Sequence, residues 1–281
     1  MIRQLHRVLR SALPEPVKAP LRRLLNLWRN RGSRPQPALI REDGHLLAKL
    51  PGPLLLRLTD DSKGSLAYQF QTDRSSAIEM AEFLAHARQR RTLVDAGAHH
   101  ALFSALFCLS HPDNRALAFE PSPIALAIAT RNLELNGLRD RACLRPVALG
   151  SSHDESVAVL DPVGFVRLAG GPPAGPRLSL SVRTLDEELD ATSLAPDLFK
   201  LDVEGFEPEV LDGARNTLRR HHPLIFLELH LDLLERRGIA PQSVLATLKA
   251  CGYDRFTVNG RMVTPARICG SSEQVIRLLA T

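Results

Sequence analysis

The stretch VDAGAHHALFS, residues 94–104, decides the fold, because an apolar strand ends there in small residues that open a helix. The strand is predicted over residues 92–96, and the helix is expected to begin at about Ala101. A helix that starts directly after a strand turns its first backbone N–H groups and its positive end outward. This geometry suits a nucleotide or a carboxylate. The turn lacks the GxGxxG pattern, which weighs against a nicotinamide dinucleotide.

From residue 91 onward, short apolar runs alternate with helical stretches. Further strands are predicted at residues 116–120, 143–149, 198–203 and 224–229, and helices at residues 122–136, 207–220 and 241–250. Such alternation predicts a parallel sheet that helices cover on both faces. Ligands of such sheets bind at the carboxyl ends of the strands, so the polar residues there are the candidate site.

An acid stands at the end of the second strand. Glu120 lies 23 residues after Gly97, where a carboxylate can accept hydrogen bonds from a ribose diol. Taken alone, Glu120 is equally well explained as a solvated loop acid. Its spacing from the glycine turn favours ribose binding.

Charged residues also follow the next two strands. The segment FKLDVEGFE, residues 199–207, places Lys200 and three acids where an apolar strand should stop, and Glu228 interrupts an apolar strand just before His230. A carboxylate in a buried strand needs a partner or a function. Glu228 is therefore paired with a cation such as Lys200, or part of a site, or both.

These motifs resemble those of the FkbM family of S-adenosylmethionine-dependent methyltransferases. Order and spacing agree over about 190 residues, and the lysine-led DVEG segment is the most specific piece. The matching segments are VDAGAHHALFS (94–104), FEPSP (119–123), RNLELNGL (131–138), VALGS (147–151), VRTLDEEL (182–189), FKLDVEGFEPEVLDGA (199–214) and LIFLELH (224–230).

The resemblance implies an α/β, Rossmann-like class I methyltransferase fold. Its mostly parallel sheet has seven strands, with the final strand antiparallel and helices on both faces. The resemblance also implies that the turn binds the methionine part of the cofactor S-adenosylmethionine, that Glu120 holds its ribose, and that Ser122 and the turn at 147–151 border the adenine. Residues 200–207 would line the boundary between cofactor and acceptor. The residues assigned to cofactor binding are Asp95, Gly97, Ala98, His99, Ala101, Glu120, Pro121, Ser122, Ala148 and Asp202.

The turn departs from the family pattern D-x-G-A-N-x-G at two positions. His99 replaces Asn, and a neutral imidazole can also donate and accept hydrogen bonds, with a different reach. Ala101 replaces the last Gly, and at a helix start we expect it to need no unusual backbone angle. Cofactor binding is therefore expected to survive. The alternative is a noncatalytic, methyltransferase-like binding protein with a degraded cofactor turn.

The resemblance implies an O-methyltransferase that acts on a sugar, a glycan or a small metabolite. Candidates for the base that removes the hydroxyl proton are Asp202, Glu204, Glu228 and His230, with His230 or Asp202 preferred. A surface histidine just past a strand is the structural alternative for His230. Asp202, Glu228 and His230 also offer ligand atoms for a divalent metal, but no fixed-spacing motif supports one, so none is expected. An enzyme that uses a nicotinamide cofactor is the remaining, disfavoured class.

The charge of the chain is unevenly distributed. Nine basic residues and one acid give residues 1–40 a charge of +8, which leaves −3 for the rest of a chain whose net charge is +5. The spacing of Val17, Leu21, Leu24, Leu25 and Trp28 predicts a basic amphipathic helix. That helix would contact a membrane surface, a second subunit or the protein's own body. Nucleic acid is not expected as a partner, and the oligomeric state stays open.

Three regions are therefore predicted: a basic arm and linker at 1–40, a lead-in of short strands and a helix at 41–90, and the methyltransferase domain at 91–281. In the lead-in, Ser75 or Ser76 is expected to cap the helix, and the Gly- and Pro-rich loop 169–176 is expected to border the acceptor or to be a plain surface connection. Four widely spaced cysteines suit a reducing compartment, and no apolar run is long enough to span a bilayer. A cytoplasmic protein is expected, peripheral to the inner membrane surface if the arm binds lipid.

Overall fold

The computed structural model describes residues 38–42, 45–49, 54–64, 74–160, 166–168, 177–192 and 194–281. The helix predicted over residues 17–28 and the loop 169–176 lie outside these residues. Within them, no helix is both long and apolar enough to cross a bilayer.

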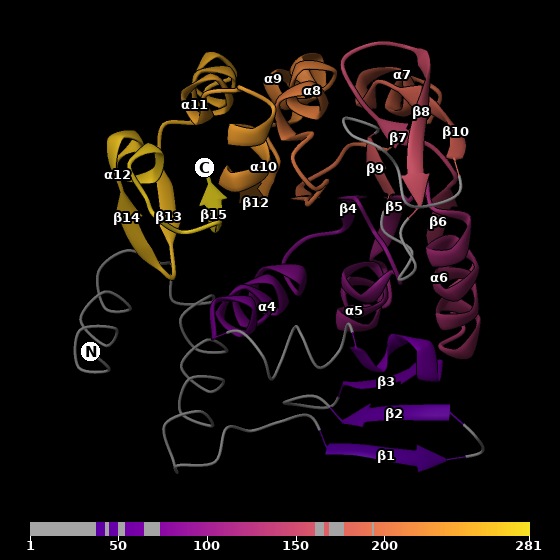
Figure 1. Ribbon diagram of the computed structural model, residues 1–281. Helices are drawn as coiled ribbons and strands as arrows, with labels where there is room; N and C mark the ends of the chain where they lie inside the picture. Colours follow the sequence, from indigo (N-terminus) through magenta and orange to yellow (C-terminus); the bar gives the residue numbers. More distant parts are fainter. Residues whose placement is uncertain are drawn as a thin grey trace.

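A large sheet forms the centre of the molecule (Figure 1). Its strands follow the order β14-β13-β15-β12-β11-β4-β5-β6. Neighbours from β12 to β6 are parallel, and β15 is antiparallel to β12 and to β13. Their bounds are β4 Thr92–Ala96, β5 Arg115–Phe119, β6 Ala142–Arg145, β11 Leu198–Leu201, β12 Leu224–His230, β13 Phe256–Val258, β14 Arg261–Val263 and β15 Val275–Ala280.

The Rossmann-like fold is confirmed, with one correction. The predicted sheet has seven strands, whereas the observed sheet has eight, because the short edge strand β14 forms an antiparallel hairpin with β13. The antiparallel final strand, β15, is as expected. The chain proceeds from β4 outward to β6 and returns through β11 on the other side of β4, so the sheet has its topological switch point between β4 and β11.

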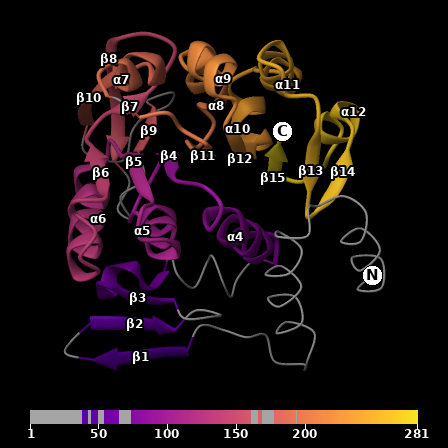
Figure 2. The ribbon, with the colours of Figure 1, turned by 180° about the vertical axis from the view of Figure 1, so that it is seen from behind.

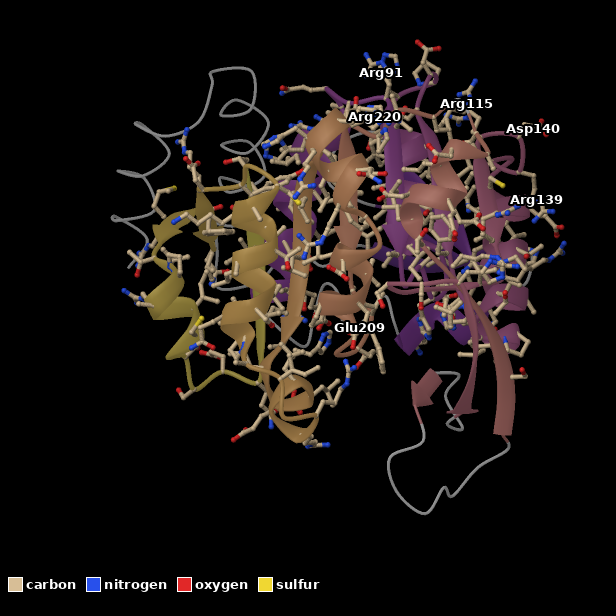
Figure 3. All side chains as sticks on the ribbon, turned by 90° about the horizontal axis from the view of Figure 1, so that it is seen from above. Arg91, Arg115, Arg139, Asp140, Glu209 and Arg220 are labelled. Carbon is tan, nitrogen blue, oxygen red and sulfur yellow. The ribbon has the colours of Figure 1, made fainter. Side chains whose placement is uncertain are left out.

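Helices cover both faces of this sheet, as the alternating pattern predicts (Figures 1, 2 and 3). Helices α4 to α6 lie on one face and α7 to α11 on the other. Their bounds are α4 Arg74–Ala87, α5 Leu102–Ser110, α6 Pro123–Leu135, α7 Leu185–Asp190, α8 Glu207–Asp212, α9 Arg215–His221, α10 Leu231–Arg236, α11 Pro241–Ala250 and α12 Pro265–Cys269.

Two smaller sheets flank the large one. The first contains β1 Ala38–Glu42, β2 His45–Lys49 and β3 Leu55–Leu58, and a 3₁₀ turn at Asp60–Ser62 follows it. The second has the order β7-β10-β8-β9. Its bounds are β7 Ala148–Leu149, β8 Asp154–Leu160, β9 Val166–Leu168 and β10 Arg177–Arg183.

Three predicted elements differ from the structure. The strand predicted at 143–149 is split into β6 and β7, which belong to different sheets, because Pro146 between them has no N–H for a ladder. The helix predicted at 207–220 is two helices that meet at Gly213, where an added Cβ would lie 2.0 Å from the backbone oxygen of Gly150. Helix α4 begins at Arg74, so Ser75 and Ser76 lie inside the helix and do not cap it.

The lead-in shares its core with the large sheet. Leu56 and Leu58 of β3 and Phe83 of α4 are buried in one cluster with residues of α5 and β12. The Phe83 ring lies 4.8 Å from the ring of Phe103 and 5.6 Å from that of Phe226, centroid to centroid. The division of the chain at residues 40 and 90 stays a prediction.

Candidate functional site

The turn after β4 lies at the switch point and runs against the end of β11. The N–H groups of Gly97 and Ala98 both donate to the backbone oxygen of Phe119, at 3.0 Å, which ties the turn to β5. Gly97 has φ +79°, and a Cβ built there would lie 1.8 Å from the backbone oxygen of Asp202. Only glycine allows the chain to pass so close to β11 at this angle.

Both residues that depart from the family pattern adopt left-handed backbone angles. His99 has φ +48° and Ala101 has φ +57°. The expectation that Ala101 needs no unusual angle is therefore wrong, because the turn completes a left-handed step before α5 begins. An L side chain in this region costs about 1–2 kcal/mol. The His99 ring stacks on the His100 ring, with centroids 3.8 Å apart.

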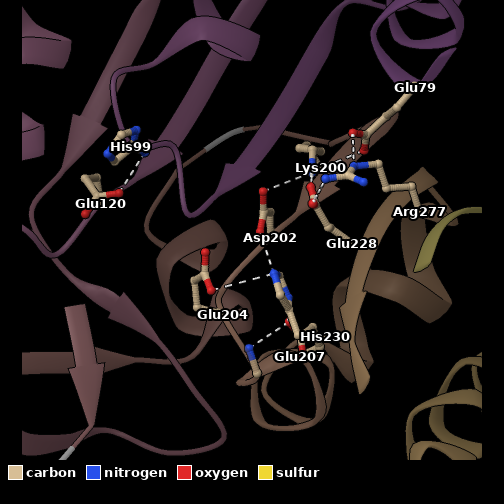
Figure 4. A network of polar contacts seen from close by, with 11 residues as sticks. Glu79, His99, Glu120, Lys200, Asp202, Glu204, Glu207, Glu228, His230 and Arg277 are labelled. Atoms are coloured by element: carbon tan, nitrogen blue, oxygen red, sulfur yellow. Dashed lines mark hydrogen bonds and ion pairs between the residues drawn. The ribbon is translucent and has the colours of Figure 1, made fainter. Parts of the chain in front are cut away.

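Glu120 stands at the end of β5, beside this turn (Figure 4). One carboxylate oxygen accepts from the N–H of His99 at 2.7 Å, and the other accepts from the N–H of Ser122 at 2.8 Å. Glu120 is 6% exposed, and burial raises its pKa to about 7 against these two hydrogen bonds. Each oxygen keeps the capacity for a second hydrogen bond. The carboxylate is thus held in place with lone pairs to spare.

Of the other predicted cofactor residues, Asp95 and Ser122 are buried and hydrogen-bonded within the protein, whereas Pro121 and Ala148 have no polar side-chain atom. Asp95 is buried, and one of its oxygens accepts from Ser104 Oγ at 2.6 Å; burial raises its pKa to about 6. Ser122 is also buried and caps α6, where its Oγ accepts from the N–H of Ala125. Pro121 follows Glu120 and is half-buried. Ala148 lies in the second sheet, where it pairs with Val182.

A buried ionic cluster lies at the carboxyl ends of β11 and β12 (Figure 4). Its centre is Lys200, which is 1% exposed. Its Nζ lies 3.3 Å from Glu79, 3.4 Å from Glu228 and 3.5 Å from Asp202. Arg277 of β15 pairs with the second oxygen of Glu228 and lies 3.4 Å from Glu79. Glu228 is therefore paired with two cations, which confirms the interpretation that this buried carboxylate has a basic partner such as Lys200.

Within the cluster, the pKa of one carboxyl group is raised and that of another is lowered. Burial and the nearby Asp202 raise the pKa of Glu228, against Lys200 and Arg277. For Asp202 the effect of burial is outweighed by Lys200 and His230, which hold its pKa below the ordinary value. The Asp202 side chain is 26% exposed, against 4% for Glu228. Asp202 is therefore the charged member of the cluster that a ligand can reach.

His230 lies on the side of Asp202 that faces away from Lys200 (Figure 4). Its Nδ1 lies 2.8 Å from Glu207, whose side chain is fully buried, and its Nε2 lies 3.8 Å from Asp202 and 3.7 Å from Glu204. Burial lowers the pKa of His230, but the hydrogen bond to Glu207 and the carboxylates of Asp202 and Glu204 outweigh it and raise the pKa to about 9. The alternative of a surface histidine is therefore wrong, because His230 is only 5% exposed.

All four predicted catalytic residues are thus brought together at one edge of the sheet. Asp202, Glu228 and His230 can each offer one ligand atom, and these atoms lie within 4.8 Å of one another. The positively charged side chains of Lys200 and Arg277 already pair with Glu228, one of these three residues. We therefore describe the group as an ion-pair cluster.

Glu79 and Arg277 were not predicted to belong to the site. Arg277 is the single charge in the apolar strand β15, and such a charge signals a buried partner, whereas Glu79 is one of two glutamates on α4 and does not stand out. The sequence carries no signal for which partner that is. Glu207 lies within the segment predicted to line the site, but its contact with His230 depends on how α8 packs against β12.

Two sequence comparisons match this chain to methyltransferases. The model of the methyltransferase FkbM domain matches residues 95–255. Methyltransferase sdnD of Sordaria araneosa is 30% identical over 197 residues, which cover 58% of this chain and 73% of that protein.

Among solved structures, the methyltransferase FkbM of Methylobacillus flagellatus is 18% identical with a TM-score of 0.43, and the match covers 78% of this chain and 57% of that one. TYW2 of M. jannaschii in complex with AdoMet is 13% identical with a TM-score of 0.41, and the match covers 86% of each chain. Because the family model matches more than half of the chain, the protein belongs to the FkbM methyltransferase family.

Proposed function

We propose that the protein transfers the methyl group of S-adenosylmethionine to a hydroxyl group of a sugar, a glycan or a small metabolite. The observation that carries this proposal is the placement of Glu120, the glycine turn and the Asp202–His230 cluster at one switch point. When bound, the cofactor supplies a methyl group on a positively charged sulfur, and transfer leaves a neutral thioether.

The residues of the turn fit this cofactor. Glu120 offers lone pairs at the position from which a ribose diol is held, and its carboxylate is oriented by two backbone N–H groups. His99 and Ala101 adopt left-handed backbone angles, and the N–H of His99 still donates to Glu120, so the turn and this acid remain joined although two side chains differ from the family pattern. This supports a working cofactor site over the noncatalytic alternative.

His230 is the residue best suited to take the acceptor's proton. Glu207 binds Nδ1, which leaves Nε2 facing Asp202 and Glu204, the two most exposed members of the cluster. A base is most effective when its pKa lies near the working pH, and a pKa of about 9 meets this condition better than the lowered pKa of Asp202. In the transfer, the hydroxyl proton passes to Nε2 while the oxygen lone pair forms the bond to carbon. Asp202 and Glu204 stabilise the imidazolium that results.

Calorimetric titration tests cofactor binding. We expect heat with S-adenosylmethionine and its demethylated product and none with NAD. Glu120→Ala should weaken binding about tenfold to a hundredfold, because hydrogen bonds to a charged group contribute about 1.5–3 kcal/mol. Glu134→Ala, an exposed acid on α6, is the matched control. Unchanged affinity in Glu120→Ala would contradict the ribose assignment, and heat with NAD alone would contradict the proposed class.

The pH dependence of binding gives a second test of the same carboxylate. Ribose hydroxyls donate to the ionised form, and the pKa of Glu120 is raised to about 7. Affinity for the demethylated product should therefore fall about tenfold for each pH unit below 7 and level off above it. The Glu120→Gln variant should lose this dependence. The acceptor itself can be sought by mass spectrometry, as a gain of one CH₂ group.

A further inference from the structure

The amino-terminal edge of the large sheet carries a row of arginines. Arg91 directly precedes β4, Arg115 begins β5, Arg141 precedes β6 and Arg255 precedes β13. The strand register places the starts of β6, β5, β4, β11 and β12 side by side. At about 4.8 Å per strand, the row from β6 to β13 extends over about 30 Å.

Four more arginines extend this row into the adjoining turns. Arg88 follows α4, Arg139 lies between α6 and β6, and Arg219 and Arg220 lie in the last turn of α9, just before β12. All four are exposed. We call these eight residues the arginine edge. In Figure 3 the labelled Arg91, Arg115, Arg139 and Arg220 lie away from Glu209, which marks the side of the cluster.

Two arginines of this edge donate hydrogen bonds to backbone oxygens at or after the end of a helix. Arg141 donates to the backbone oxygens of Cys108, His111 and Pro112 at the end of α5, and Arg115 donates to those of Pro112 and Asn114. Such contacts complement the negative end of a helix. They do not involve the outer arginines, Arg88 and Arg139, for which the described residues offer no carboxylate within ion-pair distance.

Acids on this edge are fewer and partly engaged. Asp197 accepts from the N–H groups of Arg91 and Thr92, and Asp190 lies 3.9 Å from Arg220. Asp113, Asp140 and Asp254 are exposed. The edge as a whole therefore keeps an excess of positive charge, on the side opposite a cluster with more carboxylates than cations.

We propose that the arginine edge docks the protein on the surface of an anionic lipid bilayer. A row about 30 Å long fits an extended negative surface better than a single anion. Nucleic acid is disfavoured, because in the described part of the chain no Phe, Tyr or Trp side chain is exposed to stack on bases. Docking by this edge leaves the opposite edge, with Glu120 and Asp202, open to the acceptor. The proposal is independent of the reaction, since no edge residue belongs to the candidate site.

Vesicle sedimentation with the full chain tests this proposal. Vesicles of phosphatidylcholine with about one third phosphatidylglycerol (on the order of the anionic content at which surface charge attracts basic groups) should bind the protein, and vesicles of phosphatidylcholine alone should not. The test variant is R88Q/R139Q/R255Q, which removes three exposed charges along the edge. The control is R131Q/R236Q/R261Q, which removes three exposed arginines elsewhere. Thermal melting confirms that both are folded.

The test variant should bind anionic vesicles about a hundredfold more weakly, since each basic residue near the surface contributes about 1 kcal/mol. The control should stay within about threefold of the unchanged protein, because none of its three arginines belongs to the arginine edge. Equal vesicle binding by the test variant would assign any docking to residues 1–40 and overturn the proposal. So would absence of wild-type binding, or binding to single-stranded poly(U) that exceeds vesicle binding and depends on the edge.

Discussion

Gly97 shows at the level of one residue how the turn and β11 depend on each other. An added methyl group would meet the backbone oxygen of Asp202 at 1.8 Å, and the positive φ adds strain. Gly137, also at positive φ, has open space around it and serves as the control. Gly137→Ala should lower the free energy of unfolding by about 1 kcal/mol, from strain alone. Gly97→Ala should lower it by about 3 kcal/mol or more and abolish cofactor binding. Equal losses in urea denaturation would show that the close approach is unimportant.

His230 owes its raised pKa to one neighbour above the others. The hydrogen bond that Nδ1–H donates to Glu207 is the largest effect that raises it. In Glu207→Gln the pKa of His230 should therefore fall from about 9, and the pH at which methyl transfer reaches half its maximum should fall with it. NMR titration of the imidazole measures the first quantity without an acceptor. Because the base must be neutral, the rate should rise with pH through this pKa; a rate that falls there would exclude His230 as the base.

At the scale of elements, two asparagines of the segment RNLELNGL join α6 to the lead-in. Asn132 is fully buried; its Oδ1 accepts from the N–H of Thr59, and its Nδ2 donates to Ser62 Oγ and to the backbone oxygen of His100. Asn136 bonds to the N–H and C=O of Arg57 in β3. One helix thus anchors both the lead-in and the cofactor turn.

Loss of the buried asparagine should cost more than loss of the outer one. Asn132→Ala leaves buried backbone groups unpaired, so we expect about 3 kcal/mol of lost stability and faster hydrogen exchange at Thr59. Asn136→Ala, where water can replace the amide, should cost about 1 kcal/mol. Similar values for the two variants, measured by urea denaturation, would contradict this account of α6 as the joining element.

At the scale of the whole molecule, the ionic cluster connects three distant parts of the chain. Glu79 comes from α4, Lys200 from β11 and Arg277 from β15, and both Glu79 and Arg277 lie outside the residues that the family model matches. The lead-in and the last strand thereby contribute directly to the charge around Asp202. The candidate site is assembled from more of the chain than the family segment alone.

Glu79→Gln tests this connection. Removal of one partner from a buried ion pair leaves uncompensated charge, so the variant should lose about 3–5 kcal/mol of stability at pH 7. Glu82→Gln is the matched control on the same helix, because burial raises the pKa of both acids but only Glu79 faces the cations Lys200 and Arg277. That variant should change stability by less than about 1 kcal/mol. Comparable losses in the two variants would mean that Glu79 does not balance Lys200 and Arg277.

The sequence by itself determined the alternation of strands and helices that contains β4, β5, β11 and β12, the glycine turn, the acid at the end of β5 and the four candidate catalytic residues, because these follow from apolar periodicity and from motifs of adjacent residues. It did not predict the second sheet or the hairpin of β13 and β14. Local periodicity failed at Gly213, which meets the distant backbone of Gly150. The strand predicted at 143–149 overlooked Pro146, which has no N–H for a ladder. Only the tertiary structure decided that Glu79 and Arg277 complete the cluster, that Glu207 orients His230, and that arginines before separate strands form one row. Such contacts join residues far apart in the chain, and their partners are set by packing and strand register, which no local pattern encodes.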